Sequence, residues 1–318
     1  MVASEPARPA QRCAACGAPR LVLHMRVAGE AGPEGLAPGT LRFGVALADV
    51  ARCAACGHMQ LAPMPGHEML ERAYEEAESG DYLNEEAGQR ATARAALDRI
   101  ERHVAPERLL DAGCWVGFLL DEARRRGWQV VGVEPSEFAV RHARERLGLD
   151  VRQAALFDAG LEPRGFDALV LADVIEHLPD PGAALDQLAA LARPGAVLAL
   201  MLPDAGSRMA RLLGRRWWSV IPTHVHLFTR RSLTVLLERH GWQVLELGTA
   251  PKAFTVRYYL GRIGGYAPWL SRLLVATAER AGVAGRVWAP DFGDRMAVIA
   301  RAPGPPAGRP ATMGPSHS

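Results

Sequence analysis

From residue 108 onward, short apolar runs alternate with segments whose apolar positions recur at helical spacing. Such alternation is typical of a parallel sheet with helices on both faces. We therefore predict an α/β fold built on a doubly wound, Rossmann-like sheet of seven strands. The expected strands lie at residues 108–112, 129–134, 151–153, 166–172, 196–202, 243–248 and 295–301. The main expected helices lie at 118–126, 137–147, 181–192 and 230–240.

The remaining segments differ in composition and define a provisional domain organisation. The expected segments are a flexible N-terminus at 1–12, a cysteine-containing module at 13–66, a helical lead-in at 67–107, the sheet domain at 108–302 and a disordered Pro/Gly-rich tail at 303–318. An insertion at about 258–291 is expected to carry an amphipathic helix. This helix could cap the substrate site, touch a membrane surface, join a dimer or simply pack on the core.

Four of the five cysteines form two matched Cys-x-x-Cys-Gly motifs, Cys13 with Cys16 and Cys53 with Cys56. Two such motifs supply the four thiolates that zinc prefers in structural sites. Because four sulfurs leave no open coordination position, we predict a structural Zn²⁺ in a zinc-ribbon-like module, with strands at 22–27 and 41–50 between the motifs. The alternative is a redox pair or two unrelated thiol pairs.

Composition excludes few classes of function. The chain has 318 residues, and its net charge of +2 gives no strong signal for nucleic acid. Neither a signal peptide nor an apolar run long enough for a transmembrane segment is visible. We therefore expect a cytoplasmic protein, in which cysteine pairs are more often metal ligands or redox sites than disulfides. The oligomeric state stays open.

The turn after strand 108–112 carries the strongest chemical signal. Gly113 allows a tight turn, and Gly117 lets the next helix begin close to the strand and to a ligand. Glu134 ends the following strand, so its carboxylate is expected at the tip of a neighbouring parallel strand, where a ribose diol would bind. This combination indicates an adenosine-containing cofactor.

The glycine spacing favours one such cofactor over another. A dinucleotide fingerprint requires glycine where this chain has Trp115. Asp111, Gly113 and Gly117 instead occupy three of the four fixed positions of Asp-x-Gly-x-Gly-x-Gly, with Cys114 in the second variable position. Here the chain resembles a class I S-adenosylmethionine-dependent methyltransferase. Trp115 departs from the pattern, and a positive φ at that position would cost about 1–2 kcal/mol.

The resemblance implies a cofactor site at the carboxyl ends of the strands. It places the methionine part of S-adenosylmethionine at the turn, the ribose at the acidic strand tip, and the adenine after the third strand. The implied cofactor-binding residues are Asp111, Gly113, Cys114, Gly117, Glu134, Leu156, Asp158 and Asp173. The resemblance also implies that the seventh strand runs antiparallel between the fifth and the sixth.

Histidines supply the candidates for acid–base chemistry. The segment after strand 166–172 resembles the family's acidic segment, with Glu176 and His177 directed at the catalytic face. In a later strand-like stretch, His224 and His226 are expected to project on one face. Because no third ligand is apparent beside that pair, we discount a catalytic metal. We predict His226 or His177 as general base, oriented by Glu176; the alternative for His177 is packing at a helix turn.

The sequence therefore favours methyl transfer to a small-molecule acceptor such as a sugar, a polyketide or another metabolite, at oxygen or carbon. One alternative is an RNA base methyltransferase, which would need a contiguous basic face; only residues 208–216 hint at one. A second is a binding protein that kept the fold and lost turnover, for which Trp115 is the main argument. A nicotinamide-dependent oxidoreductase is disfavoured by the broken fingerprint.

Overall fold

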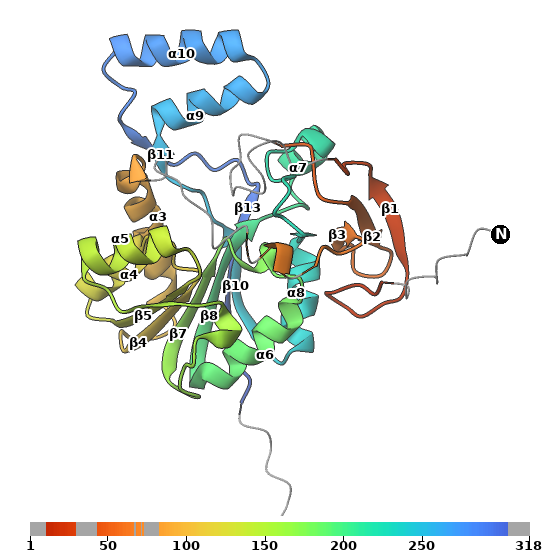
Figure 1. The fold of residues 1–318 in the computed structure, drawn as a ribbon, viewed down its shortest axis with the longest axis vertical. Helices are drawn as coiled ribbons and strands as arrows, with labels where there is room; N and C mark the ends of the chain where they lie inside the picture. Colours follow the sequence, from red (N-terminus) through yellow and green to blue (C-terminus); the bar gives the residue numbers. More distant parts are fainter. Residues whose placement is uncertain (1–10, 30–42, 67, 71, 73–82, 305–318) are drawn as a thin grey trace, which may run out of the picture.

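The computed structural model describes residues 11–29, 43–66, 68–70, 72 and 83–304 (Figure 1). The expected N-terminal segment and C-terminal tail lie almost entirely outside these residues. So does most of the first half of the helical lead-in.

A seven-stranded sheet forms the centre of the molecule, as predicted. Its strand order is β10-β13-β8-β7-β4-β5-β6. The strands are β4 (Arg108–Ala112), β5 (Gln129–Glu134), β6 (Val151–Gln153), β7 (Phe166–Ala172), β8 (Ala192–Pro203), β10 (Gln243–Thr249) and β13 (Arg295–Arg301). β13 runs antiparallel to both β8 and β10, which confirms its expected place between the fifth and sixth strands.

Three of the five helices around the sheet begin at a residue whose side chain caps the first turn. The helices around the sheet are α3 (Glu86–Ile100), α4 (Phe118–Arg125), α5 (Glu137–Leu147), α6 (Pro181–Leu191) and α8 (Arg230–Arg239). At the starts of α5, α6 and α8, the side-chain oxygens of Ser136, Asp180 and Thr229 accept hydrogen bonds from backbone N–H groups of the first turn. Such caps satisfy amide groups that have no partner within the helix. The expected bounds of α4, α5, α6 and α8 agree with the observed ones to within one residue.

The helices cover both faces of the sheet (Figure 1). Successive side chains of a strand point to opposite faces. Leu110 of β4 accordingly belongs to a core shared with α6 and α8, whereas its neighbour Leu109 belongs to a core shared with α3, α4 and α5. This division makes the sheet doubly wound.

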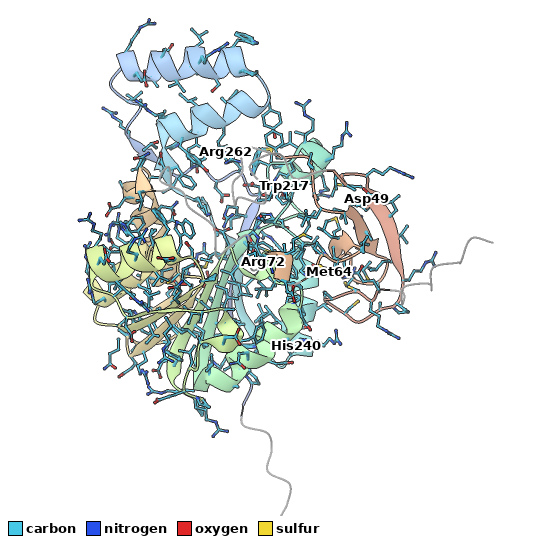
Figure 2. All side chains as sticks on the ribbon, viewed as in Figure 1. Asp49, Met64, Arg72, Trp217, His240 and Arg262 are labelled. Carbon is cyan, nitrogen blue, oxygen red and sulfur yellow. The ribbon has the colours of Figure 1, made fainter. Side chains whose placement is uncertain are left out.

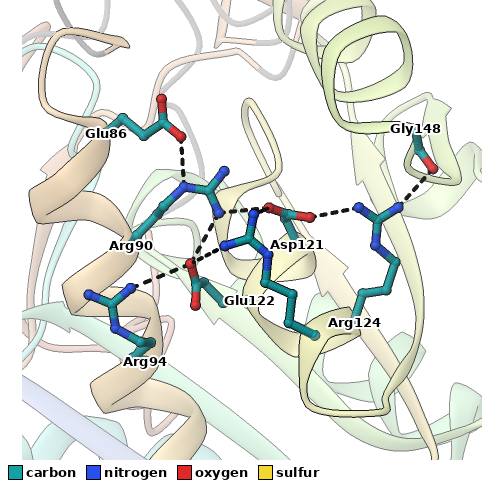
Figure 3. Close-up of polar contacts among 8 residues, drawn as sticks. Glu86, Arg90, Arg94, Asp121, Glu122, Arg124 and Gly148 are labelled. Atoms are coloured by element: carbon teal, nitrogen blue, oxygen red, sulfur yellow. Dashed lines mark hydrogen bonds and ion pairs between the residues drawn. The ribbon is translucent and has the colours of Figure 1, made fainter.

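Buried ion pairs join α3 to α4. Arg90 of α3 donates hydrogen bonds to Asp121 Oδ2 at 2.7 Å and to Glu122 Oε1 at 3.1 Å, and it also contacts Glu86 (Figure 3). Arg124 binds the other oxygen of Asp121 at 2.7 Å. These bonds compensate for the burial of two carboxylates on α4, because a buried charge is tolerated only when it is paired.

A smaller antiparallel sheet adjoins the cysteine motifs, the first of which precedes its first strand and the second of which lies at the turn between its second and third strands. Its order is β1-β2-β3-β9, formed by β1 (Leu21–Met25), β2 (Asp49–Cys53), β3 (Met59–Ala62) and β9 (His226–Leu227). The expected strand at 41–50 is displaced toward the C-terminus, because β2 runs directly into the second cysteine motif. β9 comes from within the expected domain at 108–302, so the division near residue 66 stays a prediction. Trp217 is buried in the core of this sheet (Figure 2).

The insertion forms a helical hairpin that projects from the sheet domain (Figure 1). It contains α9 (Val256–Arg262) and α10 (Pro268–Arg280). Trp269 and Leu273, two residues of the expected apolar face of α10, are 66% and 54% exposed. In the described part of the chain, no helix is long and apolar enough to span a membrane.

Candidate active site

The turn between β4 and α4 takes a conformation that requires glycine twice. Gly113 and Gly117 have φ of +82° and +85°, and a Cβ at Gly117 would lie 2.6 Å from Leu149 Cδ1. Trp115 between them has φ of 47°. Trp115 therefore has the left-handed backbone conformation, which costs an L-amino acid about 1–2 kcal/mol. The indole packs toward Phe138 at the start of α5.

Glu134 ties the tip of β5 to this turn. Its carboxylate accepts the backbone N–H of Trp115 at 2.9 Å and that of Ser136 at 3.0 Å. The side chain is 4% exposed, and burial raises its pKa to about 7, although the two N–H donors oppose the shift. Each oxygen retains a lone pair, so the carboxylate can accept the two hydroxyls of a ribose.

Asp111 offers a second acceptor beside Glu134. Its Oδ1 is buried and has no hydrogen-bond partner among the described residues. Burial raises the pKa of Asp111 to about 7, and the neighbouring charge of Glu134 adds to the shift. A buried acceptor without a donor is costly. A ligand ammonium group would satisfy it, so the two carboxylates fit a cofactor that carries an amine and a ribose.

The other expected cofactor residues differ in exposure. Cys114 is buried beneath the turn, whereas Leu156 is half-buried and Asp158 is exposed in the short 3₁₀ segment Leu156–Asp158 after β6. Their proposed contacts with the cofactor stay predictions.

Asp173 follows β7 in a left-handed conformation with φ of 57°. It forms ion pairs with Arg295 at the start of β13 and with Lys252, the single lysine of the chain. Burial alone would raise the pKa of Asp173, but the charges of Arg295 and Lys252 hold it well below its usual range. Arg295 and Lys252 were not identified from the sequence. An arginine that begins a strand and an isolated lysine carry no local signal of a shared partner.

Glu176, His177 and His224 converge beyond the carboxyl end of β7. Each offers a ligand atom, and these atoms lie within 4.8 Å of one another. Both Glu176 oxygens are buried without a hydrogen-bond partner among the described residues, and burial raises the Glu176 pKa to about 8. Glu176 and His177 come from a segment almost fifty residues before His224, so the local sequence around His224 did not reveal them as neighbours.

His226 lies in a different environment from His224. Its Nδ1 is 3.0 Å from His58 Nε2, and its Nε2 faces the carbonyl of Pro179 at 3.4 Å. The ring is 1% exposed, and burial lowers its pKa to about 4. His224 instead contacts His177, with ring centroids 4.6 Å apart. The structure thus separates the two histidines that were expected to share a face.

The four cysteines of the N-terminal motifs meet as predicted. Cys13 and Cys56 have their Sγ atoms 3.6 Å apart, as do Cys16 and Cys53. Thiolates bound at about 2.3 Å around a tetrahedral ion lie about 3.8 Å apart. All five cysteines of the chain are free of disulfides. This donor set and spacing fit a structural zinc ion.

Comparison with known proteins agrees with the fold. A profile of the methyltransferase domain family matches residues 84–247, more than half of the chain. The chain therefore belongs to this family, and the class predicted from the sequence is confirmed.

Curated relatives and solved structures extend the comparison. The chain is 35% identical over 117 residues to a ubiquinone biosynthesis O-methyltransferase of Nitrobacter winogradskyi. This match covers 35% of this chain and 41% of the relative. A protein of the same name from Chromobacterium violaceum is 34% identical over 107 residues, and this match covers 31% of this chain and 46% of that protein. The matched region spans less than half of these relatives. The fold is shared with a chain in the solved complex between the Haloferax volcanii Trm112 methyltransferase activator and a methyltransferase. The TM-score is 0.50 and the sequence identity is 17%, and the match covers 69% of this chain and 92% of that chain.

Proposed function

We propose that this chain transfers the methyl group of S-adenosylmethionine to a hydroxyl oxygen of a small-molecule acceptor. The observation that carries the proposal is the pairing of Asp111 and Glu134 at the turn after β4. One is a buried acceptor without a donor, and the other is held in place by two backbone N–H groups. The relatives that are named O-methyltransferases support an oxygen acceptor.

The proposed cofactor site follows from these positions. The Asp111 carboxylate would bind the α-ammonium group, and Glu134 would accept from the ribose hydroxyls. Gly113 and Cys114 would present their backbone to the methionine part, and Leu156 and Asp158 would border the adenine. When bound, the cofactor supplies an electrophilic methyl group on a positively charged sulfur.

The groups after β7 would position the methyl acceptor and remove its proton. Methyl transfer needs an in-line arrangement of nucleophile, methyl carbon and sulfur, and positioning can supply about 7–11 kcal/mol of the barrier. His177 is half-buried beside Glu176, whereas His226 is enclosed by protein. This difference in exposure supports His177 over His226 as the general base. Asp173, held by Arg295 and Lys252, would form the floor of the site.

Calorimetry with S-adenosylmethionine tests the cofactor site, and release of S-adenosylhomocysteine in a screen of hydroxylated metabolites tests the reaction. We expect cofactor binding that is abolished in Glu134→Ala and unchanged in Glu137→Ala, which alters an exposed carboxylate on the adjacent helix. A chain that binds a nicotinamide cofactor and ignores S-adenosylmethionine would overturn the proposal. Binding without turnover on any acceptor would favour the non-catalytic alternative.

Exposed arginines keep the RNA alternative open to test. Arg208, Arg211, Arg215 and Arg216 of α7 (Arg208–Leu213) and the following 3₁₀ turn are all exposed. Phosphate contacts release counterions, so affinity for RNA would fall steeply with salt. Binding of RNA that weakens with salt, and that is lost when these arginines become glutamine, would favour an RNA substrate over a small molecule.

A further inference from the structure

Among the described residues, two groups of side chains could hold a metal ion, and the second group is separate from the four cysteines. It consists of Glu176, His177 and His224, whose ligand atoms lie within 4.8 Å of one another. Ligands at about 2.1 Å from a common ion lie about 3.0–3.4 Å apart, so small side-chain rotations complete such a set. We propose that these three residues bind a divalent transition-metal ion beside the cofactor site.

The hydrogen bonds of the two histidines fix their tautomers. His177 Nδ1 lies 2.8 Å from the carbonyl oxygen of Thr223, and His224 Nδ1 lies 2.8 Å from that of Ser219. A carbonyl oxygen can only accept, so each Nδ1 carries the hydrogen and each Nε2 carries a lone pair. Metal-binding histidines typically donate their other N–H to a carbonyl or carboxylate in this way. Both rings are therefore prepared to bind through Nε2.

Glu176 supplies the negative charge. Its side chain is 1% exposed, and neither oxygen has a hydrogen-bond partner among the described residues. A buried carboxylate without a partner is strongly unfavourable, and a bound cation removes that cost. The nearby positive charges of Arg295 and Lys252 are both paired with Asp173, which limits their repulsion of an ion.

The backbone holds the three ligands together before any ion binds. Glu176 and His177 lie in the 3₁₀ turn Ile175–His177 directly after β7. The segment that carries His224 is attached to this turn by the bond from Val225 N to the Glu176 carbonyl at 3.0 Å, and by the His177–Thr223 bond. The ligand geometry is thus built into the junction between the large sheet and β9.

The donor set indicates the class of ion. Imidazole suits zinc, iron, nickel and copper, whereas magnesium and calcium prefer oxygen ligands alone. Two imidazoles and one carboxylate favour Mn²⁺, Fe²⁺, Co²⁺ or Zn²⁺ over Mg²⁺. Three protein ligands leave coordination positions open for a substrate atom.

An ion at this position would select an acceptor that carries a hydroxyl group. This inference about the acceptor rests on the proposed function. A metal ion lowers the pKa of a bound hydroxyl, as it does for bound water. The hydroxyl proton passes to solvent, and the oxygen lone pair forms the bond to the methyl carbon. The carbon–sulfur bond breaks with its electron pair retained by sulfur, which yields neutral S-adenosylhomocysteine. In this arrangement Glu176 and His177 act as ligands, and the bound ion replaces the general-base role proposed for His177.

Titration of the zinc-loaded full chain with Mn²⁺, followed by the electron paramagnetic resonance signal of free Mn²⁺, tests the site. Mn²⁺ is chosen because soft thiolate sites select zinc. We expect one bound Mn²⁺ per chain. Glu176→Gln, His177→Asn and His224→Asn should each weaken binding by more than about 100-fold, beyond the 10–100-fold typical of residues that only orient ligands.

The matched control is His240→Asn. His240 lies just before β10, at the opposite end of the strands (Figure 2). This variant should bind Mn²⁺ like the unaltered chain. Glu176→Gln keeps the shape of the side chain and removes a buried charge, so its circular dichroism melting curve should show a folded protein.

The two proposals fail separately. Absence of Mn²⁺ binding, or binding unchanged in all three ligand variants, would overturn the metal site even if S-adenosylmethionine binds and methyl transfer proceeds. Site-specific Mn²⁺ binding to a chain that ignores S-adenosylmethionine would leave the site intact and overturn the proposed function.

Discussion

His58 Nε2 lies 3.0 Å from His226 Nδ1 and joins the second cysteine motif to β9. His58 comes two residues after Cys56, and β9 pairs with β3 in the small sheet. The cysteines also belong to the same core as Leu233 and Leu236 of α8. The cysteine module and the methyltransferase domain therefore share a sheet, a core and a buried histidine pair.

Removing cysteines that would hold a zinc ion should consequently destabilise the whole chain. In Cys13→Ser/Cys16→Ser we expect loss of about one equivalent of zinc and a Tm lower by about 5 °C or more, since 1 kcal/mol corresponds to about 2–4 °C for a domain of this size. Metal analysis and differential scanning calorimetry measure both quantities. A methyltransferase domain that melts at its original temperature would show that the two parts unfold independently.

Cofactor affinity should depend on pH through Glu134. In the proposed site the ribose hydroxyls would donate to the ionised carboxylate of Glu134, and burial raises the pKa of Glu134 to about 7. Affinity for S-adenosylmethionine should therefore fall as the pH is lowered from 8 to 6, by up to about tenfold per unit below the pKa. Calorimetry at several pH values measures this.

The same shift affects stability with the opposite sign. An acid whose pKa is higher in the folded state binds more protons there, so the stability of the cofactor-free chain should fall as pH rises from about 4.5 to about 7. Glu134→Gln should flatten both dependences. An identical pH profile in this variant would assign the effect to another group, and Asp111 is the first candidate because its pKa is also about 7.

Gly117 should tolerate no side chain. A Cβ there would lie 2.6 Å from Leu149 Cδ1 and 3.2 Å from Ala143 Cβ, in addition to the cost of a positive φ. We expect Gly117→Ala to lower the free energy of unfolding by about 2–4 kcal/mol, from backbone strain and overpacking together. The control is Gly127→Ala, which has φ of +93° but no atom within 4 Å of the added Cβ. Urea unfolding should show only the backbone cost in the control, and equal losses would indicate that packing contributes nothing at Gly117.

Arg90 should matter far more than a surface arginine. Its removal leaves Asp121 and Glu122 buried with fewer partners, at 2% and 7% side-chain exposure. We expect Arg90→Ala to cost about 3 kcal/mol, toward the lower end for broken buried pairs because Arg124 and Arg125 remain near Asp121. Arg141→Ala, which breaks an exposed pair with Glu137, should cost less than about 1 kcal/mol. Chemical denaturation compares the two variants, and similar losses would contradict the role given to burial.

The sequence by itself determined the fold class, most element bounds and two candidate sites. β4, β5, β6, β7 and β13 end where the apolar runs end, because turn glycines, caps and strand alternation act over a few residues. The position of Glu134 at a strand tip follows from the same local pattern. The meeting of the four cysteine sulfurs at one place was predictable because two repeated Cys-x-x-Cys-Gly motifs together supply the four thiolates of one structural metal site.

Only the tertiary structure decided which distant groups meet. It separated His224 from His226, placing one beside Glu176 and His177 and the other beside His58. It also brought Arg295 and Lys252 to Asp173, and it added β9 to the small sheet. These contacts join residues tens to more than a hundred positions apart, and their partners are chosen by the packing of whole elements and by the need to pair buried charges. No local pattern of polar and apolar residues encodes that choice.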